Sequence, residues 1–202
     1  MFATYGFNPA YTVEVSPEFP LDGVWAEPMH AFDRDGRHLA EPLTRWGAPV
    51  VVGVLPHQRG TWVGNFAAGG LGGETAVAAC PRGTDICVVV DGLAYLVGVD
   101  HPEDDAVLLL DQVKQLVGVA SPPRLVLVND LGAVALGESG IAWKTPRLAL
   151  DGLWLDRVLP DGLVLTADQV EGGTNTIMLD VATGEQTSGA RFRDCWPPDA
   201  LA

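Results

Sequence analysis

Lysine is almost absent from this 202-residue chain, and acidic residues outnumber basic ones. Lys114 and Lys144 are the two lysines, and 12 basic residues against 26 acidic ones give a formal net charge of −14. A surface this negative repels phosphate backbones and anionic lipids, so we expect neither nucleic acid nor a membrane as partner. A basic protein would be attracted to it, although negative charge also serves solubility alone.

Long apolar runs are also missing, and none approaches the ~20 residues that span a bilayer. The first residues, MFATYGFNPAYTVEV, carry no basic start, apolar segment or small-residue cleavage site, so they predict no secretory signal. We therefore expect a soluble, cytoplasmic protein. The three cysteines, Cys80, Cys87 and Cys195, are odd in number and lack the spacing of a disulfide scaffold, so we expect free thiols.

Helical periodicity is scarce, whereas short strand-like runs are abundant. The best helix candidate, residues 104–119, also reads as strand in its later half, and we expect strand there. Apolar runs such as APVVVGVL (48–55), ICVVV (86–90) and LVLTA (163–167) are separated by turn residues drawn from 24 glycines and 15 prolines. The sequence therefore predicts an all-β fold with few helices.

Three of the apolar runs recur at a nearly constant spacing. Ile86 and Leu125 are 39 residues apart, and Leu125 and Leu163 are 38 apart. A period of about 40 residues built from short strands is typical of propeller blades. We expect antiparallel β-meander repeats of this length, arranged as a partial or small β-propeller-like fold, a curved sheet or a sandwich.

Two segments carry a family resemblance. TIMLDVATGEQ (176–186) and AVALGESGIAWKT (133–145) resemble the strand–turn units of quinoprotein-type (PQQ-like) β-propeller repeats, which combine a Thr-Gly turn with a following Trp. Here Thr-Gly occurs in one unit and Trp143 in another. The resemblance implies a blade-like β-meander and does not support quinone binding or dehydrogenase activity. We expect no cofactor.

The chain divides by composition into three parts. Residues 1–46 are rich in proline, charge and aromatics and are expected to pack on the sheet as an N-terminal extension. Residues 47–190 form the expected β-repeat domain, and residues 191–202 form a C-terminal tail.

Two acidic segments resemble cation sites. FDRDGRH (32–38) has the centre of a calcium loop, but Ala31 and Pro42 fall where ligands are required, so a hairpin turn is the better interpretation. VDHPEDD (99–105) holds oxygen and nitrogen donors that suit a weak cation site, although neighbours in one flexible loop seldom converge on one ion. A solvated acidic loop is the main interpretation for its donors, Asp100, His101, Glu103, Asp104 and Asp105.

Catalytic and metal motifs are missing. No zinc spacing links the cysteines and histidines, so we expect no metal. GESG (137–140) lacks the last spacer of a nucleophile elbow, and nothing in the sequence brings His57 to Ser139 or Cys87. GGLGG (69–73) lacks the Lys-Ser/Thr of a phosphate loop. We therefore do not expect an enzyme, although a triad defined by geometry alone stays open.

Tryptophan is frequent, with six residues. Most such side chains fill gaps between sheets, but Trp154 alternates with Leu153 and Leu155 and should lie on the opposite face. Trp143, Trp154, Asp156 and Arg157 form the predicted protein-contact patch.

Charge, repeats and the missing catalytic set favour a non-enzymatic protein-interaction domain that binds a basic partner, such as a bacterial immunity or antitoxin-type inhibitor. One alternative is a small-molecule-binding protein or hydrolase with a site in a sheet crevice, where His57 and His101 would act. Another is a structural subunit that self-associates through its sheet edges.

Overall fold

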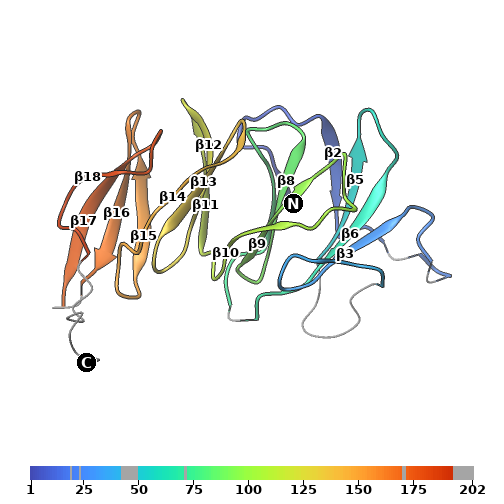
Figure 1. The fold of residues 1–202 in the computed structure, drawn as a ribbon, viewed down its shortest axis with the longest axis horizontal. Coiled ribbons are helices and arrows are strands. Elements are labelled where there is room, and N and C mark those ends of the chain that lie inside the picture. Colours follow the sequence, from blue (N-terminus) through green and yellow to red (C-terminus); the bar gives the residue numbers. More distant parts are fainter. Residues whose placement is uncertain (19, 23, 42–49, 71, 170–171, 193–202) are drawn as a thin grey trace, which may run out of the picture.

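The computed structural model describes residues 1–18, 20–22, 24–41, 50–70, 72–169 and 172–192, and these residues form strands and loops without a helix. The prediction of an all-β fold with mainly antiparallel sheets is confirmed. Four sheets lie side by side in a row along the long axis of the molecule (Figure 1). No helix in the described part of the chain is long and apolar enough to cross a membrane.

The first and second sheets each have five strands and each contain one parallel pair. The first sheet has the order β2 (Tyr11–Val15), β5 (Val50–Pro56), β6 (Trp62–Phe66), β3 (Met29–Phe32) and β4 (His38–Leu39). The second has the order β1 (Phe2–Ala3), β7 (Ala76–Ala79), β8 (Asp85–Val90), β9 (Leu93–Gly98) and β10 (Val107–Leu110).

The third and fourth sheets are antiparallel meanders of four consecutive strands each. The third contains β11 (Gln115–Ala120), β12 (Pro123–Val128), β13 (Ala133–Gly137) and β14 (Gly140–Lys144). The fourth contains β15 (Leu153–Val158), β16 (Gly162–Asp168), β17 (Thr174–Asp180) and β18 (Gln186–Ser188). The three recurring apolar runs lie on β8, β12 and β16.

Alternation along the strands explains why the middle sheets are apolar on both faces. On β8, Ile86 and Val88 join the core with the first sheet, whereas Cys87 and Val89 join the core with the third. On β12, alternate residues pack toward the second and fourth sheets in the same way. Successive side chains of a strand point to opposite faces, so a sheet stacked on both sides needs a continuous apolar run.

Residues 1–46 supply β1–β4, which pair with strands of the first two sheets. The division at residues 46 and 190 stays a prediction, and the tail beyond residue 192, with Cys195, lies outside the described residues. Cys80 and Cys87 are free and buried, as expected.

Candidate functional site

Acidic residues line a cavity of about 450 Å³ at one end of the second sheet. The turn between β7 and β8 and the loop between β9 and β10 form its walls. The ionisable side chains that line it are Arg82, Asp85, Asp100, His101, Asp104 and Asp105. We call this cavity the acidic pocket. Four carboxylates thus face one arginine and one histidine there.

Local hydrogen bonds fix the two walls relative to each other. The Asp85 amide donates to Arg82 O at 3.0 Å and closes the β7–β8 turn. The Val99 amide donates to Thr84 O at 2.8 Å and joins this turn to the start of the β9–β10 loop. Asp85 and the loop carboxylates are therefore held on a connected backbone.

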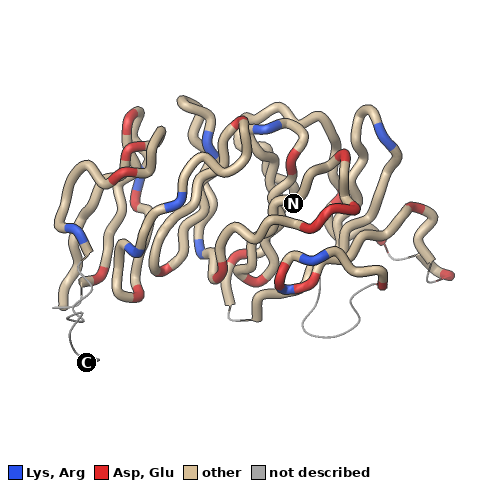
Figure 2. The backbone as a smooth tube through the Cα atoms, viewed as in Figure 1, with Lys and Arg blue, Asp and Glu red and all other residues tan. Residues whose placement is uncertain are grey.

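The β3–β4 hairpin of the first sheet anchors the far end of the loop. The His38 amide donates to Asp105 Oδ1 at 2.7 Å, and the Ala106 amide donates to Gly36 O at 2.8 Å. Gly36 has φ +79°, and a Cβ there would lie 2.5 Å from Ala106 O, so glycine is required at this contact. The acidic loop thus bridges two sheets. Its red segments lie next to the β3–β4 hairpin (Figure 2).

Asp85 is the buried carboxylate of the pocket, with 6% of the residue exposed. Its Oδ2 lies 3.8 Å from an Arg82 guanidinium nitrogen. Burial raises the pKa of the Asp85 carboxyl, and the Arg82 charge opposes that rise. A buried carboxylate that one cation compensates only in part is a site where a second cation is favoured.

Four of the five predicted loop residues line the acidic pocket, and Glu103 lies outside it. Glu103 Oε1 pairs with His101 Nδ1 at 3.4 Å and borders another cavity with His30 and Trp62. Among the described residues, no three His, Cys, Asp or Glu side chains are grouped so that they could hold a metal ion. Asp105 is also engaged by the His38 amide. Sequence analysis did not identify Asp85 and Arg82 as candidate site residues. Their one feature in the sequence is that they lie in a charged turn directly before a continuous apolar strand.

The second acidic segment is a hairpin, as expected. β3 and β4 pair antiparallel, and Asp33 Oδ1 accepts hydrogen bonds from the amides of Asp35 and Arg37 at 2.8 and 2.9 Å. The Asp33 carboxylate therefore caps the turn between β3 and β4.

The predicted contact patch divides between surface and core. Trp154 is 53% exposed on β15, flanked by buried Leu153 and Leu155, and Arg157 is exposed on the same strand. Asp156 accepts a 2.6 Å hydrogen bond from the Thr166 hydroxyl. Trp143 is not brought to this surface: its side chain is buried against the fourth sheet, and its indole nitrogen donates to Val181 O at 2.9 Å.

The candidate nucleophiles and the candidate base lie on different elements. GESG forms the β13–β14 turn, with Gly137 opposite Gly140. Cys87 is fully buried, and burial raises its thiol pKa to about 12, which leaves little thiolate for catalysis at neutral pH. His57 lies just beyond β5 in the first sheet, and Ser139 lies in the third.

Comparisons with known proteins do not assign this chain to a family. No protein-family model matches it, and no curated protein matches it significantly.

Proposed function

We propose that this protein is a non-enzymatic interaction domain that binds a basic protein partner through the acidic pocket. The observation that carries the proposal is that four acidic residues, one of them the buried Asp85, line a single cavity. A lysine or arginine side chain of a partner would enter the cavity and compensate the negative charge that Arg82 does not neutralise. An inhibitor of the bacterial immunity or antitoxin type is the specific form that we favour.

The charge of the whole chain supports the same partner. A net charge of −14 accelerates encounter with a basic protein, and the acceleration falls as salt screens it. The exposed Trp154 on the fourth sheet offers a second, aromatic contact of the kind that anchors interfaces.

We further propose that the sheets are blade-like repeats of about 40 residues. Two observations support this: the recurring runs occupy the second strand of each of the last two meanders, and Trp143 packs directly on Gly184. Gly184 belongs to the Thr-Gly turn of the next sheet, so the two residue types that carry the quinoprotein-type resemblance meet between neighbouring sheets.

The test uses two variants of equal charge. D100N/D104N neutralises two carboxylates of the acidic pocket, and D151N/D161N neutralises two exposed carboxylates of the fourth sheet. Each immobilised protein is exposed to lysate of the source organism at 20 and 150 mM salt, and bound proteins are identified by mass spectrometry.

We expect one recurrent basic protein to bind the unmodified chain and D151N/D161N, more weakly at 150 mM salt. D100N/D104N should retain about tenfold less of it, because two charge-assisted contacts with the partner would be lost, and tenfold corresponds to about 1.4 kcal/mol. Equal retention by both variants would place the interface elsewhere, and no partner at either salt would reject the proposal for this organism.

A further inference from the structure

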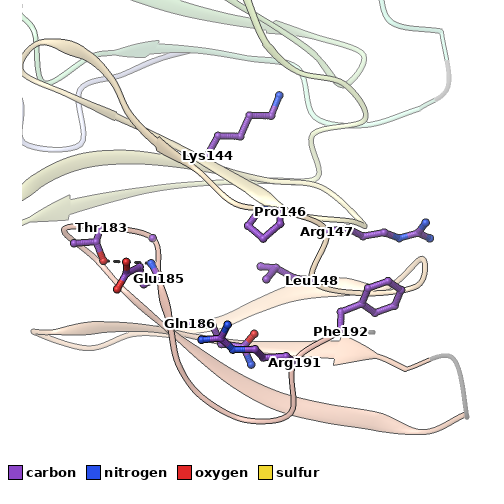
Figure 3. Close-up of a pocket in the computed structure, with 10 residues that line it drawn as sticks. Lys144, Pro146, Arg147, Leu148, Thr183, Glu185, Gln186, Arg191 and Phe192 are labelled. Carbon is purple, nitrogen blue, oxygen red and sulfur yellow. Dashed lines mark hydrogen bonds between the residues drawn. The ribbon is translucent and has the colours of Figure 1, made fainter. Parts of the chain in front are cut away.

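A second cavity, of about 600 Å³, lies between the third and fourth sheets and has the opposite charge. One wall is the segment after β14, and the other is the β17–β18 turn together with residues 191–192 (Figure 3). We call it the basic groove. The residues that define its chemistry are Lys144, Pro146, Arg147, Glu185, Arg191 and Phe192.

The charge of the groove departs from that of the molecule. Three cations, Lys144, Arg147 and Arg191, line it with one carboxylate, Glu185, in a protein where acidic residues outnumber basic ones by more than two to one. The three cations come from both walls: Arg191 lies beside Gln186, Arg147 extends toward Phe192, and the Lys144 side chain as drawn extends away from the opposite wall, so its ammonium group must swing round to meet a ligand in the groove (Figure 3). A ligand with several separated anionic groups matches this distribution better than a compact ion.

Arg147 is held in place before any ligand binds. Its Nε donates to Ala149 O at 2.9 Å, a terminal nitrogen donates to Leu150 O, and the guanidinium carbon lies 5.2 Å from the centre of the Phe192 ring. The remaining donors of the guanidinium are thus presented at fixed geometry. Lys144 and Arg191 are exposed, and the flexible stem of lysine lets its ammonium group reach a bound anion.

The groove also borders the open edges of two sheets. Lys144 ends β14, the outermost strand of the third sheet, and Gln186 begins β18, the outermost strand of the fourth. An extended chain can lie along such edges, with alternate side chains toward the groove. Pro146 and Phe192 offer apolar contacts between the cations.

From the positive charge of the groove, the fixed Arg147 and the two open sheet edges beside it, we infer that the basic groove binds an extended acidic peptide segment of another protein. This site is separate from the acidic pocket and does not depend on the function proposed for it.

The probe is a fluorescein-labelled peptide of four Glu-Val repeats, with four Gln-Val repeats as its neutral control, and binding is measured by fluorescence anisotropy. The variant K144Q/R191Q removes two of the three cations of the groove and leaves Arg147, which already donates to Ala149 O and Leu150 O. R34Q/R59Q removes two exposed cations elsewhere and matches the change in net charge. Urea unfolding midpoints verify that both variants are folded.

We expect the Glu-Val peptide to bind the unmodified protein and R34Q/R59Q within about twofold of each other, and K144Q/R191Q about tenfold more weakly. E185Q should bind about threefold more tightly, because it removes the one opposing carboxylate. Equal weakening in both double variants, or equal binding of the Gln-Val peptide, would overturn the inference. A salt-sensitive dimer that K144Q/R191Q dissociates would also overturn it, since the occupant would then be a second copy.

Discussion

Asp85 illustrates how a single buried charge can oppose the stability of the folded protein. Burial raises its carboxyl pKa, so the charged form is disfavoured in the folded protein. Its contribution to stability is complete below the ordinary carboxyl pKa and is lost as pH rises through the folded pKa. At neutral pH the charge therefore costs free energy that a basic partner would offset.

D85N should accordingly raise the melting temperature at pH 7 by about 2–4 °C, the shift that 1 kcal/mol produces in a domain of this size. The gain over the unmodified protein should vanish near pH 3, where both carry a neutral group at residue 85. Melting curves from pH 3 to 8 measure this difference, with exposed D151N as control. A gain that persists at pH 3 would point to packing rather than to charge.

Trp143 and Trp154 make a matched pair at the residue scale. W143A removes a side chain that packs on Gly184 and donates to Val181 O, so it should lower the free energy of unfolding by about 3–5 kcal/mol. W154A removes a side chain that is 53% exposed and should change it by about 0.5 kcal/mol or less. Urea titration measures both, and comparable losses would contradict the assigned burial.

The sequence distinguished only one of these tryptophans. Alternation with Leu153 and Leu155 places Trp154 outward without reference to any other strand. Trp143 is covered by a turn some 40 residues later in the chain, and a contact between sheets leaves no mark in local periodicity. The acidic pocket has a different origin: its loop was evident as a charge cluster, and Asp85 lies beside that loop because β8 and β9 pair as a hairpin with Asp85 opposite Gly98.

At the scale of the element, local patterns identified the strands and could not identify their order. The expectation of strand over helix in residues 104–119 is confirmed by β10 and β11, which are separated where Gln112 adopts φ 55°. The parallel pairs β1–β7 and β3–β6 join segments that lie far apart in the sequence, and no turn signal predicts their pairing. Hairpins are set by adjacent residues, but such pairings are set by the tertiary fold.

The Gln115 side chain forms hydrogen bonds between the third sheet and the fourth. Gln115 on β11 donates to Leu155 O at 3.0 Å and accepts from the Leu155 amide at 2.7 Å, so it acts as an extra backbone partner for β15. Q115L should lower the free energy of unfolding by about 1–3 kcal/mol, because it leaves both Leu155 groups without this partner.

Q115E keeps the acceptor for the Leu155 amide but sets a carboxylate oxygen against the Leu155 carbonyl oxygen, so it should also lower the free energy of unfolding in urea titration. Hydrogen exchange at the Leu155 amide gives the local readout: exchange should be faster in Q115L and less affected in Q115E. Unchanged exchange in Q115L would show that the amide is protected by the sheet and not by Gln115.

At the scale of the whole molecule, charge is segregated: carboxylates gather at the acidic pocket of the second sheet, and cations gather at the groove between the third and fourth. Favourable pairs are few; within the described residues they include Lys114 with Asp130 at 2.6 Å and the partly compensated Arg82–Asp85 pair. A net charge of −14 then makes repulsion the larger long-range effect in the compact state.

Raising NaCl from 10 to 200 mM shortens the screening length from about 30 Å to below 10 Å, so the melting temperature should rise by a few degrees. Potassium chloride should act equally, since screening depends on ionic strength alone. A melting temperature that falls with salt would mean that attractive pairs outweigh repulsion. A basic partner would then not act by relieving repulsion among the excess negative charges.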